Sequence, residues 1–510
     1  MKNSSFILFA CCILGCNTGA EAIRPMQVET LDAVEITDAG AIGRGRIIDG
    51  NGRIEVYGIE LFHENDASPV VFQMKSAPVG DVFSIVMSGL EQGRNYRFRA
   101  FASDGTACYG DALTFTTATY LPPEVETLEA ANIASHVADF RGSVANRNGR
   151  ISSYGVELVY ENDTMIYRRT AALAGNGFTV AVSDLAPQRT YRFRAFVDDG
   201  SIRYGNAKTV STTEPEIIAG HIPLADPFIL HHNGVYYAYG TRNADVGKGY
   251  SAYISHDLVR WRRHSSPALD KKDCYGESGF WAPEVYYRRE NSTFYMFYTA
   301  DEHICVATAA SPLGPFTQEV KQSMHADRGI DNTLFVDEDG KAYLFFVRFT
   351  GGNVIWGAEL EDDWKTIRTG TLKQCIATAA DGWERVQGQI AEGPSVFRHN
   401  GVYYLLYSAN HYQSQDYAVG YATAASPLGT WTKAAENPIL RRPAGQVGSG
   451  HGAKFVDVNG NLRYVFHTHF STESIAPRKM YITDMSIDPS GKVTMSGEHI
   501  TGAIEYKTVR

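Results

Sequence analysis

The chain has 510 residues, of which 44% are hydrophobic and 20% charged, and its formal net charge is −10. Because this length exceeds what one hydrophobic core usually supports, we expect about three domains. The composition is typical of a globular protein, and the negative charge disfavours nucleic acid or an anionic membrane surface as a partner. Tyrosine is abundant, with 29 residues, which favours β structure.

The N-terminus has the pattern of an export signal, because a basic residue precedes an apolar run that is too short to span a bilayer. The run ends in Ile13-Leu14-Gly15-Cys16, which is similar to a bacterial lipobox, so Cys16 is the expected lipidation site. Cleavage of an ordinary signal near Ala20 or Ala22 is the alternative. We expect residues 1–22 to be the signal and anchor region of an exported protein. Such a protein is held at a bacterial cell envelope, in the periplasm or on the outer-membrane surface, and touches the membrane only through its lipid.

The cysteines that follow the signal are widely separated, and none has CxxC spacing, so neither a zinc site nor a disulfide framework is indicated. We expect free, buried thiols. These cysteines are Cys108, Cys274, Cys305 and Cys375.

One pattern occurs twice before residue 215. Tyr57-Gly58-Ile59-Glu60-Leu61 recurs as Tyr154-Gly155-Val156-Glu157-Leu158, and the strand that begins at Tyr96 recurs 95 residues later. Alternating polar and apolar residues predict strands with one buried face. The period is typical of a β-sandwich, and the units 23–118 and 119–214 resemble fibronectin type III modules. We interpret them as spacers, with carbohydrate binding as the alternative.

Residues 215–510 contain a different repeat, in which an aromatic strand follows a turn. Four of the five copies have Asn-Gly or Asp-Gly at that turn, and these pairs close tight hairpins. The copies are 47 to 61 residues apart, enough for four strands each, and predict a five-bladed β-propeller. The expected fold is therefore all-β, with two tandem β-sandwich modules followed by the propeller. The copies begin at Asn233, Ser292, Asp339, Asn400 and Asn459.

Each copy also has a polar residue on the strand before its turn, which in a propeller lines the central channel. Packing does not explain a ring of carboxyls there, because burial and like charges disfavour ionisation. A reaction explains it better, since a protonated and an ionised carboxyl together hydrolyse a glycosidic bond. Taken singly, each acid has a plainer interpretation as a turn or loop residue. The five residues are Asp226, Glu284, Asp331, Glu392 and His451.

The motifs around these residues resemble glycoside hydrolase family 43 over residues 215–510. The resemblance implies that Asp226 is the general base, Glu392 the general acid and Asp331 the residue that raises the pKa of that acid. It also implies inversion, with the base and acid carboxyls about 6.5–9.5 Å apart. The motifs are Ala225-Asp226-Pro227-Phe228-Ile229, Trp281-Ala282-Pro283-Glu284-Val285, Ile330-Asp331, Ala391-Glu392-Gly393-Pro394 and Gly450-His451-Gly452.

Further residues are candidates for substrate binding, although a core or rim position is the alternative for most of them. The resemblance also allows a structural calcium ion near His451, for which a hydrogen-bonding role is the alternative, and it requires no other cofactor. The substrate-binding candidates are Phe228, Trp281, Glu284, Asn410, His411 and Arg478.

The resemblance implies a plant-type oligo- or polysaccharide as substrate, with α-L-arabinofuranosidase activity as the first expectation. A β-xylosidase, an arabinanase and a galactan-cleaving enzyme are alternatives within the family. A propeller that binds surface glycans without turnover is an alternative of a different class, and we expect it to lack one of the three acids.

Overall fold

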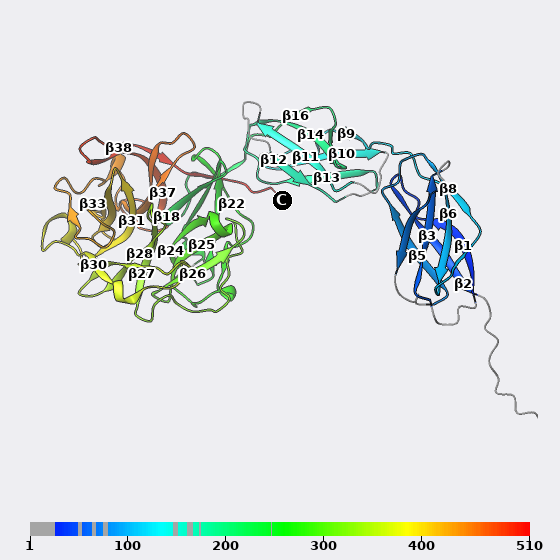
Figure 1. Ribbon diagram of the computed structural model, residues 1–510. Helices are drawn as coiled ribbons and strands as arrows, with labels where there is room; N and C mark the ends of the chain where they lie inside the picture. Colours follow the sequence, from blue (N-terminus) through cyan, green and yellow to red (C-terminus); the bar gives the residue numbers. More distant parts are fainter. Residues whose placement is uncertain are drawn as a thin grey trace, which may run out of the picture.

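The computed structural model shows an all-β chain arranged as three bodies in a row (Figure 1). None of the helices in the described part of the chain is long or apolar enough to cross a bilayer. Cys16, the expected lipidation site, lies outside the described residues. The structure describes residues 26–48, 54–63, 68–74, 80–145, 151–160, 167–172, 175–245 and 247–509. Its helices are the short 3-10 turns η1 (Asn243–Asp245), η2 (Lys271–Asp273), η3 (Arg289–Asn291), η4 (Thr369–Thr371), η5 (Gly382–Arg385) and η6 (Pro443–Gly445).

The first body contains two antiparallel sheets whose strands alternate between buried and exposed residues, as in β5 and β6. Its core includes Ile59, Phe83, Met87 and Phe98. One sheet has the order β1 (Gln27–Val34), β2 (Gly40–Ile48) and β5 (Val82–Ser88). The other has the order β4 (Val70–Met74), β3 (Val56–His63), β6 (Asn95–Ser103) and β7 (Ala107–Tyr109), with β8 (Leu113–Thr116) paired to β6.

The second body repeats this arrangement. Glu60 pairs with Arg99 in the first body, and Glu157 pairs with Arg194 in the second, so the repeated sequences occupy the same register. One sheet has the order β13 (Gly177–Val182), β10 (Ala138–Ala145) and β9 (Glu124–Thr127). The other has the order β12 (Tyr167–Thr170), β11 (Ser153–Tyr160), β14 (Thr190–Asp198) and β15 (Ile202–Tyr204), with β16 (Lys208–Ser211) paired to β14.

Five sheets of three or more strands follow one another in the described part of the third body, and β20 (Gly249–Tyr250) and β23 (Leu269–Asp270) form a separate two-stranded sheet. The first is β17 (Ile217–Ala219), β39 (Ile504–Tyr506), β22 (Arg260–Arg263), β21 (Tyr253–Ser255), β19 (Val235–Thr241) and β18 (Ala225–His232). The second is β24 (Trp281–Arg288), β25 (Thr293–Ala300) and β26 (His303–Ala309). The third is β27 (Gly329–Val336), β28 (Ala342–Phe349), β29 (Asn353–Glu359) and β30 (Lys373–Ile376). The fourth is β31 (Ala391–His399), β32 (Val402–Ala409), β33 (Ala418–Ala424) and β34 (Thr432–Lys433). The fifth is β35 (Gly450–Val456), β36 (Leu462–Thr468), β37 (Lys479–Ile487) and β38 (Val493–Gly502).

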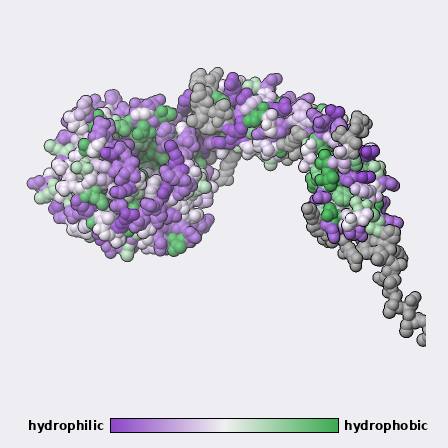
Figure 2. All heavy atoms as spheres, viewed as in Figure 1, coloured by the Kyte–Doolittle hydropathy of each residue, from purple (hydrophilic) through white to green (hydrophobic). Residues whose placement is uncertain are grey.

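The C-terminal strand β39 joins the last part of the chain to the first sheet, where it pairs with β17 and β22. Side chains of the first sheet also hold the second body, because Arg262 donates to the Ser183 carbonyl oxygen at 2.6 Å and Arg260 donates to Gln188 at 2.6 Å. In the view of Figure 2, hydrophilic residues dominate the surface and hydrophobic residues form small groups.

The innermost strand of each of the five sheets contains the same bulge. One extra residue interrupts its pairing with the second strand, as between Ala225 and Phe228 in β18. The bulged residue is in the left-handed region, with φ between 38° and 58°. This conformation costs free energy in any residue except glycine, so the surrounding contacts must hold it. The bulged residues are Asp226, Ala282, Asp331, Gly393 and His451.

The N–H groups of the bulged residues form a ring of hydrogen bonds between the sheets. In four of the five sheets, the N–H donates to a side chain on the second strand of the preceding sheet, and the fifth sheet precedes the first. Buried N–H groups are thereby satisfied without ladder partners. The four bonds run from Ala282 to Thr241 (2.9 Å), from Asp331 to Thr299 (2.9 Å), from His451 to Ser408 (2.7 Å) and from Asp226 to His467 Nδ1 (3.0 Å).

Ser408→Ala tests this ring. Because the buried His451 N–H would lose its acceptor, the fully buried Ser408 hydroxyl, we expect the free energy of unfolding to fall by about 1–3 kcal/mol. Ser486→Ala is the control, since it removes an exposed hydroxyl–hydroxyl contact and should change stability by less than about 0.5 kcal/mol. Urea denaturation measures both values, and equal losses in the two variants would show that the ring does not stabilise the fold.

Candidate active site

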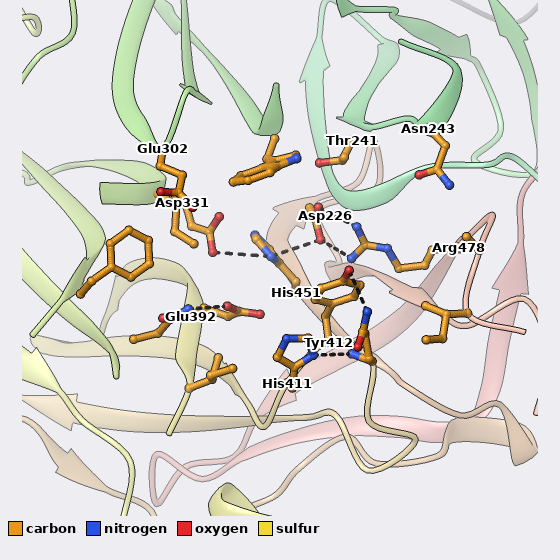
Figure 3. A pocket seen from close by; sticks show the side chains of 18 residues that line it. Asp226, Thr241, Asn243, Glu302, Asp331, Glu392, His411, Tyr412, His451 and Arg478 are labelled. Atoms are coloured by element: carbon orange, nitrogen blue, oxygen red, sulfur yellow. Dashed lines mark hydrogen bonds and ion pairs between the residues drawn. The ribbon is translucent and has the colours of Figure 1, made fainter. Parts of the chain in front are cut away.

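A cavity of about 560 Å³ opens at the end of the innermost strands where the bulges lie. Figure 3 shows the side chains of Asp226, Asp331 and Glu392 converging on it around His451. The three acids come from the first, third and fourth sheets, so three separate sheets build one site. The cavity is lined by Asp226, Thr241, Asn243, Trp281, Glu302, Ile330, Asp331, Phe349, Asn353, Ile390, Glu392, His411, Tyr412, Gln413, His451, Ile475, Ala476 and Arg478.

Asp226 is a buried carboxylate with a dedicated cation. The Arg478 guanidinium contacts both of its oxygens, with Nη1 2.9 Å from Oδ1 and Nη2 3.3 Å from Oδ2. The Thr241 hydroxyl also hydrogen-bonds to this side chain. Burial alone would raise the pKa of Asp226, but the Arg478 guanidinium outweighs burial and holds the pKa well below its usual range. Asp226 is therefore ionised.

Glu392 differs from Asp226 in that its surroundings raise its pKa. Burial and the nearby Asp226 charge raise the pKa of Glu392 to about 7, against two hydrogen bonds that favour its ionised form. Tyr417 donates to Oε1 at 2.9 Å, and Asn353 donates to Oε2 at 3.0 Å. Glu392 therefore retains a proton at mildly acidic pH, while Asp226 in the same cavity does not.

Asp331 is the third buried acid that lines the cavity. Burial raises the pKa of Asp331 well above its usual range, and the Glu392 and Asp226 charges raise it further. Its Oδ2 accepts the Gly393 N–H at 3.4 Å. This N–H is free to do so because Val347 stands where the other sheets have a hydrogen-bond acceptor. The missing acceptor at Val347 therefore leaves the N–H of Gly393, the bulged residue after Glu392, to bond to Asp331.

His451 lies between the two aspartates, with Nδ1 3.3 Å from Asp226 Oδ1 and 3.8 Å from Asp331 Oδ2. Burial lowers its pKa, so the imidazole is neutral. Among the described residues, no group of three or more His, Cys, Asp or Glu side chains is arranged to hold a metal ion. The calcium ion near His451 therefore stays a prediction of the resemblance.

Three of the substrate-binding candidates, Trp281, His411 and Arg478, line the cavity. Two others lie elsewhere. Phe228 is buried against Tyr286, with ring centroids 5.2 Å apart. The Asn410 amide is fully buried and donates to the carbonyl oxygens of Trp383 and Asp416, so it supports loops next to the cavity.

Glu284 is the remaining candidate, and it does not line the cavity. It lies two residues beyond the bulged Ala282, whereas Asp226, Asp331 and His451 are themselves the bulged residues. There it accepts the Tyr286 hydroxyl at 2.5 Å, and burial raises its pKa to about 7. The connection to the second strand differs in length among the five sheets, so a count along the chain fixes a position only to within a few residues and groups Glu284 with Asp331.

Arg478→Met tests the charge balance at Asp226. The variant leaves a buried carboxylate unpaired, so we expect a loss of about 3–5 kcal/mol at pH 7. Without Arg478, burial raises the pKa of Asp226, so acidification protonates this carboxyl and relieves the variant, whereas the stabilisation in the wild type is lost only below the unfolded value of about 3.9. The difference in free energy of unfolding between wild type and variant should therefore become smaller on acidification. Arg441→Met, which breaks a half-exposed pair with Asp416, should cost at most about 1 kcal/mol. Urea denaturation from pH 7 to pH 4 measures both, and a gap that widens on acidification would contradict the assignment.

Comparison with known proteins identifies the third body. A solved structure described as an endo-1,4-β-xylanase from Bacteroides thetaiotaomicron is 49% identical, with a TM-score of 0.56, and covers 57% of this chain and 100% of its own. A thermostable family-43 glycoside hydrolase is 32% identical, with a TM-score of 0.50, and covers 58% and 98%.

Curated relatives are more distant. A β-D-galactofuranosidase of Aspergillus niger is 23% identical over 53% of this chain and 81% of its own length. An arabinoxylan arabinofuranohydrolase of Bacillus subtilis is 26% identical over 44% of this chain, which spans about half of that relative (52%). The family model of glycosyl hydrolases family 43 matches residues 217–493. The chain belongs to glycoside hydrolase family 43 and is a glycosidase.

Proposed function

We propose that this protein is an inverting glycoside hydrolase that releases α-L-arabinofuranose from plant-type polysaccharide. The observation that carries the proposal is the opposite protonation of two carboxyls in one cavity. Asp226 is held ionised by Arg478, and the pKa of Glu392 is raised to about 7. A hydrolase that inverts requires such a pair, with one group to activate water and the other to protonate the leaving oxygen.

In this mechanism, Asp226 takes a proton from water as the water oxygen attacks the anomeric carbon. Glu392 gives its proton to the glycosidic oxygen as the bond from that oxygen to the anomeric carbon breaks. Asp331 would modulate the pKa of Glu392, as the resemblance implies, because ionisation of either carboxyl disfavours ionisation of the other. Arg478 orients the Asp226 carboxylate and balances its charge, and the neutral His451 lies beside it.

A xylose-releasing or xylan-cleaving activity is the second candidate, because the relative that is 49% identical is described as an endo-1,4-β-xylanase. Arabinofuranose remains the first because the resemblance in sequence favoured it and one curated relative is an arabinoxylan arabinofuranohydrolase. Arabinanase and galactan-cleaving activities are further alternatives. A propeller that only binds glycan would have no need of all three acids in one cavity.

The proposal extends to the whole chain. The five sheets of residues 217–506 and their closed ring of bulge contacts support a five-bladed propeller. The paired sheets in the two preceding bodies support fibronectin type III-like spacers. A lipid on Cys16 would anchor the protein at a bacterial cell envelope, where the spacers hold the propeller toward polymer.

Glu392→Gln and Asp226→Asn test the roles. Each variant should lower kcat on arabinoxylan or arabinan by about 10²–10⁴-fold, because a proton donor or acceptor is removed. Glu436→Gln is the matched control, since Glu436 lies outside the cavity and accepts the Tyr421 hydroxyl. Release of arabinose and xylose from arabinan, arabinoxylan and xylan measures both activity and substrate. Wild-type activity that survives both cavity substitutions would refute the mechanism.

The pH dependence of kcat/KM follows from the two pKa values. Activity needs Glu392 protonated, so it should fall as pH rises through about 7. It also needs Asp226 ionised, and its depressed pKa should keep activity high at mildly acidic pH. A profile measured from pH 4 to pH 9 on a polysaccharide tests this, and an activity that keeps rising above pH 8 would contradict the assignment of the acid.

A further inference from the structure

Tyr417 lies directly before β33 and is fully buried behind the cavity wall. Its hydroxyl donates to Glu392 Oε1 at 2.9 Å. Its ring lies so close to β35 that a Cβ added at Gly450 would be 2.4 Å from it, so only glycine fits there. Burial raises the pKa of Tyr417 well above its usual range, and the hydroxyl acts only as a neutral donor. The phenol therefore has one position and one partner.

The Tyr417 ring stacks on His467, with ring centroids 5.8 Å apart and planes 18° apart. His467 is also fully buried, and its Nδ1 accepts the Asp226 N–H at 3.0 Å. Its Nε2 lies 3.2 Å from Arg478 Nη1, the atom that contacts the Asp226 carboxylate. The two stacked rings thus connect the Glu392 carboxyl to Asp226. Tyr417 contacts Glu392, and His467 contacts both the Asp226 N–H and Arg478, the cation that pairs with Asp226.

We propose that Tyr417 and His467 are positioning residues that form a rigid bridge between Glu392 and Asp226, with Tyr417 also stabilising the charge that develops on Glu392. This inference rests on the proposed function. Neither residue lines the cavity, so both act through the carboxyls and touch no substrate. The bridge sets the space between the two carboxyls, into which a water molecule and a scissile bond must fit together.

The second role follows from proton transfer. When the O–H bond of Glu392 breaks and its proton moves to the leaving oxygen, a negative charge forms beside the Tyr417 hydroxyl. A hydrogen bond to a charged acceptor is about twice as strong as one to a neutral acceptor, so the Tyr417 bond strengthens in the transition state. The other charged or titratable groups that act on Glu392 are Asp226, Asp331 and Arg478.

Tyr417→Phe keeps the stacked ring and removes only the hydroxyl. The matched control is Tyr421→Phe, which removes a tyrosine–carboxyl bond of 2.5 Å to Glu436 from β33, outside the cavity. Each variant is assayed with two aryl glycosides of the sugar that wild type releases. One has a 2,4-dinitrophenyl leaving group, which needs little protonation, and the other has a 4-methoxyphenyl group, which needs more.

For Tyr417→Phe, we expect kcat on the 4-methoxyphenyl glycoside to fall about ten- to a hundredfold, the loss that one charge-assisted hydrogen bond accounts for. On the 2,4-dinitrophenyl glycoside the loss should be less than about threefold, with KM unchanged on both. The alkaline limb of the pH profile should move to higher pH, because the lost bond favours ionised Glu392. The ratio between the two substrates comes from one sample and does not depend on how much of it is folded.

His467→Phe keeps an aromatic ring and removes the acceptor for the Asp226 N–H. Because Asp226 acts on water, this variant should lose the same factor on both glycosides. If Tyr417→Phe matches Tyr421→Phe on both substrates while Glu392→Gln and Asp226→Asn are inactive, the bridge is refuted and the proposed function stands. If wild type cleaves no glycoside or polysaccharide, the proposed function itself fails.

Discussion

The ring of hydrogen bonds at the bulges is the constraint on which the site depends. A left-handed bulge on each innermost strand turns one side chain and one N–H away from the regular ladder. The neighbouring sheet supplies the acceptor for that N–H, so the conformation of each bulge is fixed by the sheet before it. Asp226, Asp331 and His451 are bulged residues, and Glu392 directly precedes a fourth bulge. The same contacts that join the sheets therefore also aim the functional side chains.

The pKa values of the three buried acids depend on which of them lies next to the one cation, Arg478. Of the three acids, only Asp226 contacts Arg478, so Asp226 is ionised, and its charge then raises the pKa of the other two. Moving the cation toward Glu392 would exchange the properties of the acid and the base. The assignment of roles thus depends on one guanidinium on the fifth sheet and not on the chemical difference between aspartate and glutamate.

Much of the site could be predicted from the sequence, because short motifs recur in register with the aromatic strands. Asp226, Asp331, Glu392, Trp281, His411 and Arg478 all line one cavity. Membership of family 43 confirms the resemblance on which their roles were based. The sequence could not place Glu284, since the connections between the first and second strands differ in length among the sheets and a count along the chain does not show by how much.

Tyr417, His467 and Asn353 had no signal in the sequence. Tyr417 and His467 resemble the many other aromatic residues of this chain, and their importance arises only from contacts between sheets distant in sequence. Val347 also had no signal in the sequence. It matters because its side chain has no hydrogen-bond acceptor, whereas the residues at the same position in the other sheets have one. The roles of such residues can be recognised only from a structure, which shows the contacts between sheets.

In the proposed reaction, Asp226 and Glu392 act on opposite sides of one sugar, as base and acid. Proton nuclear magnetic resonance of the first sugar released, recorded before mutarotation, shows whether they do. The new hydroxyl should have the anomeric configuration opposite to that of the substrate. A product that retains the configuration of the substrate would require a covalent intermediate and would refute the roles of base and acid.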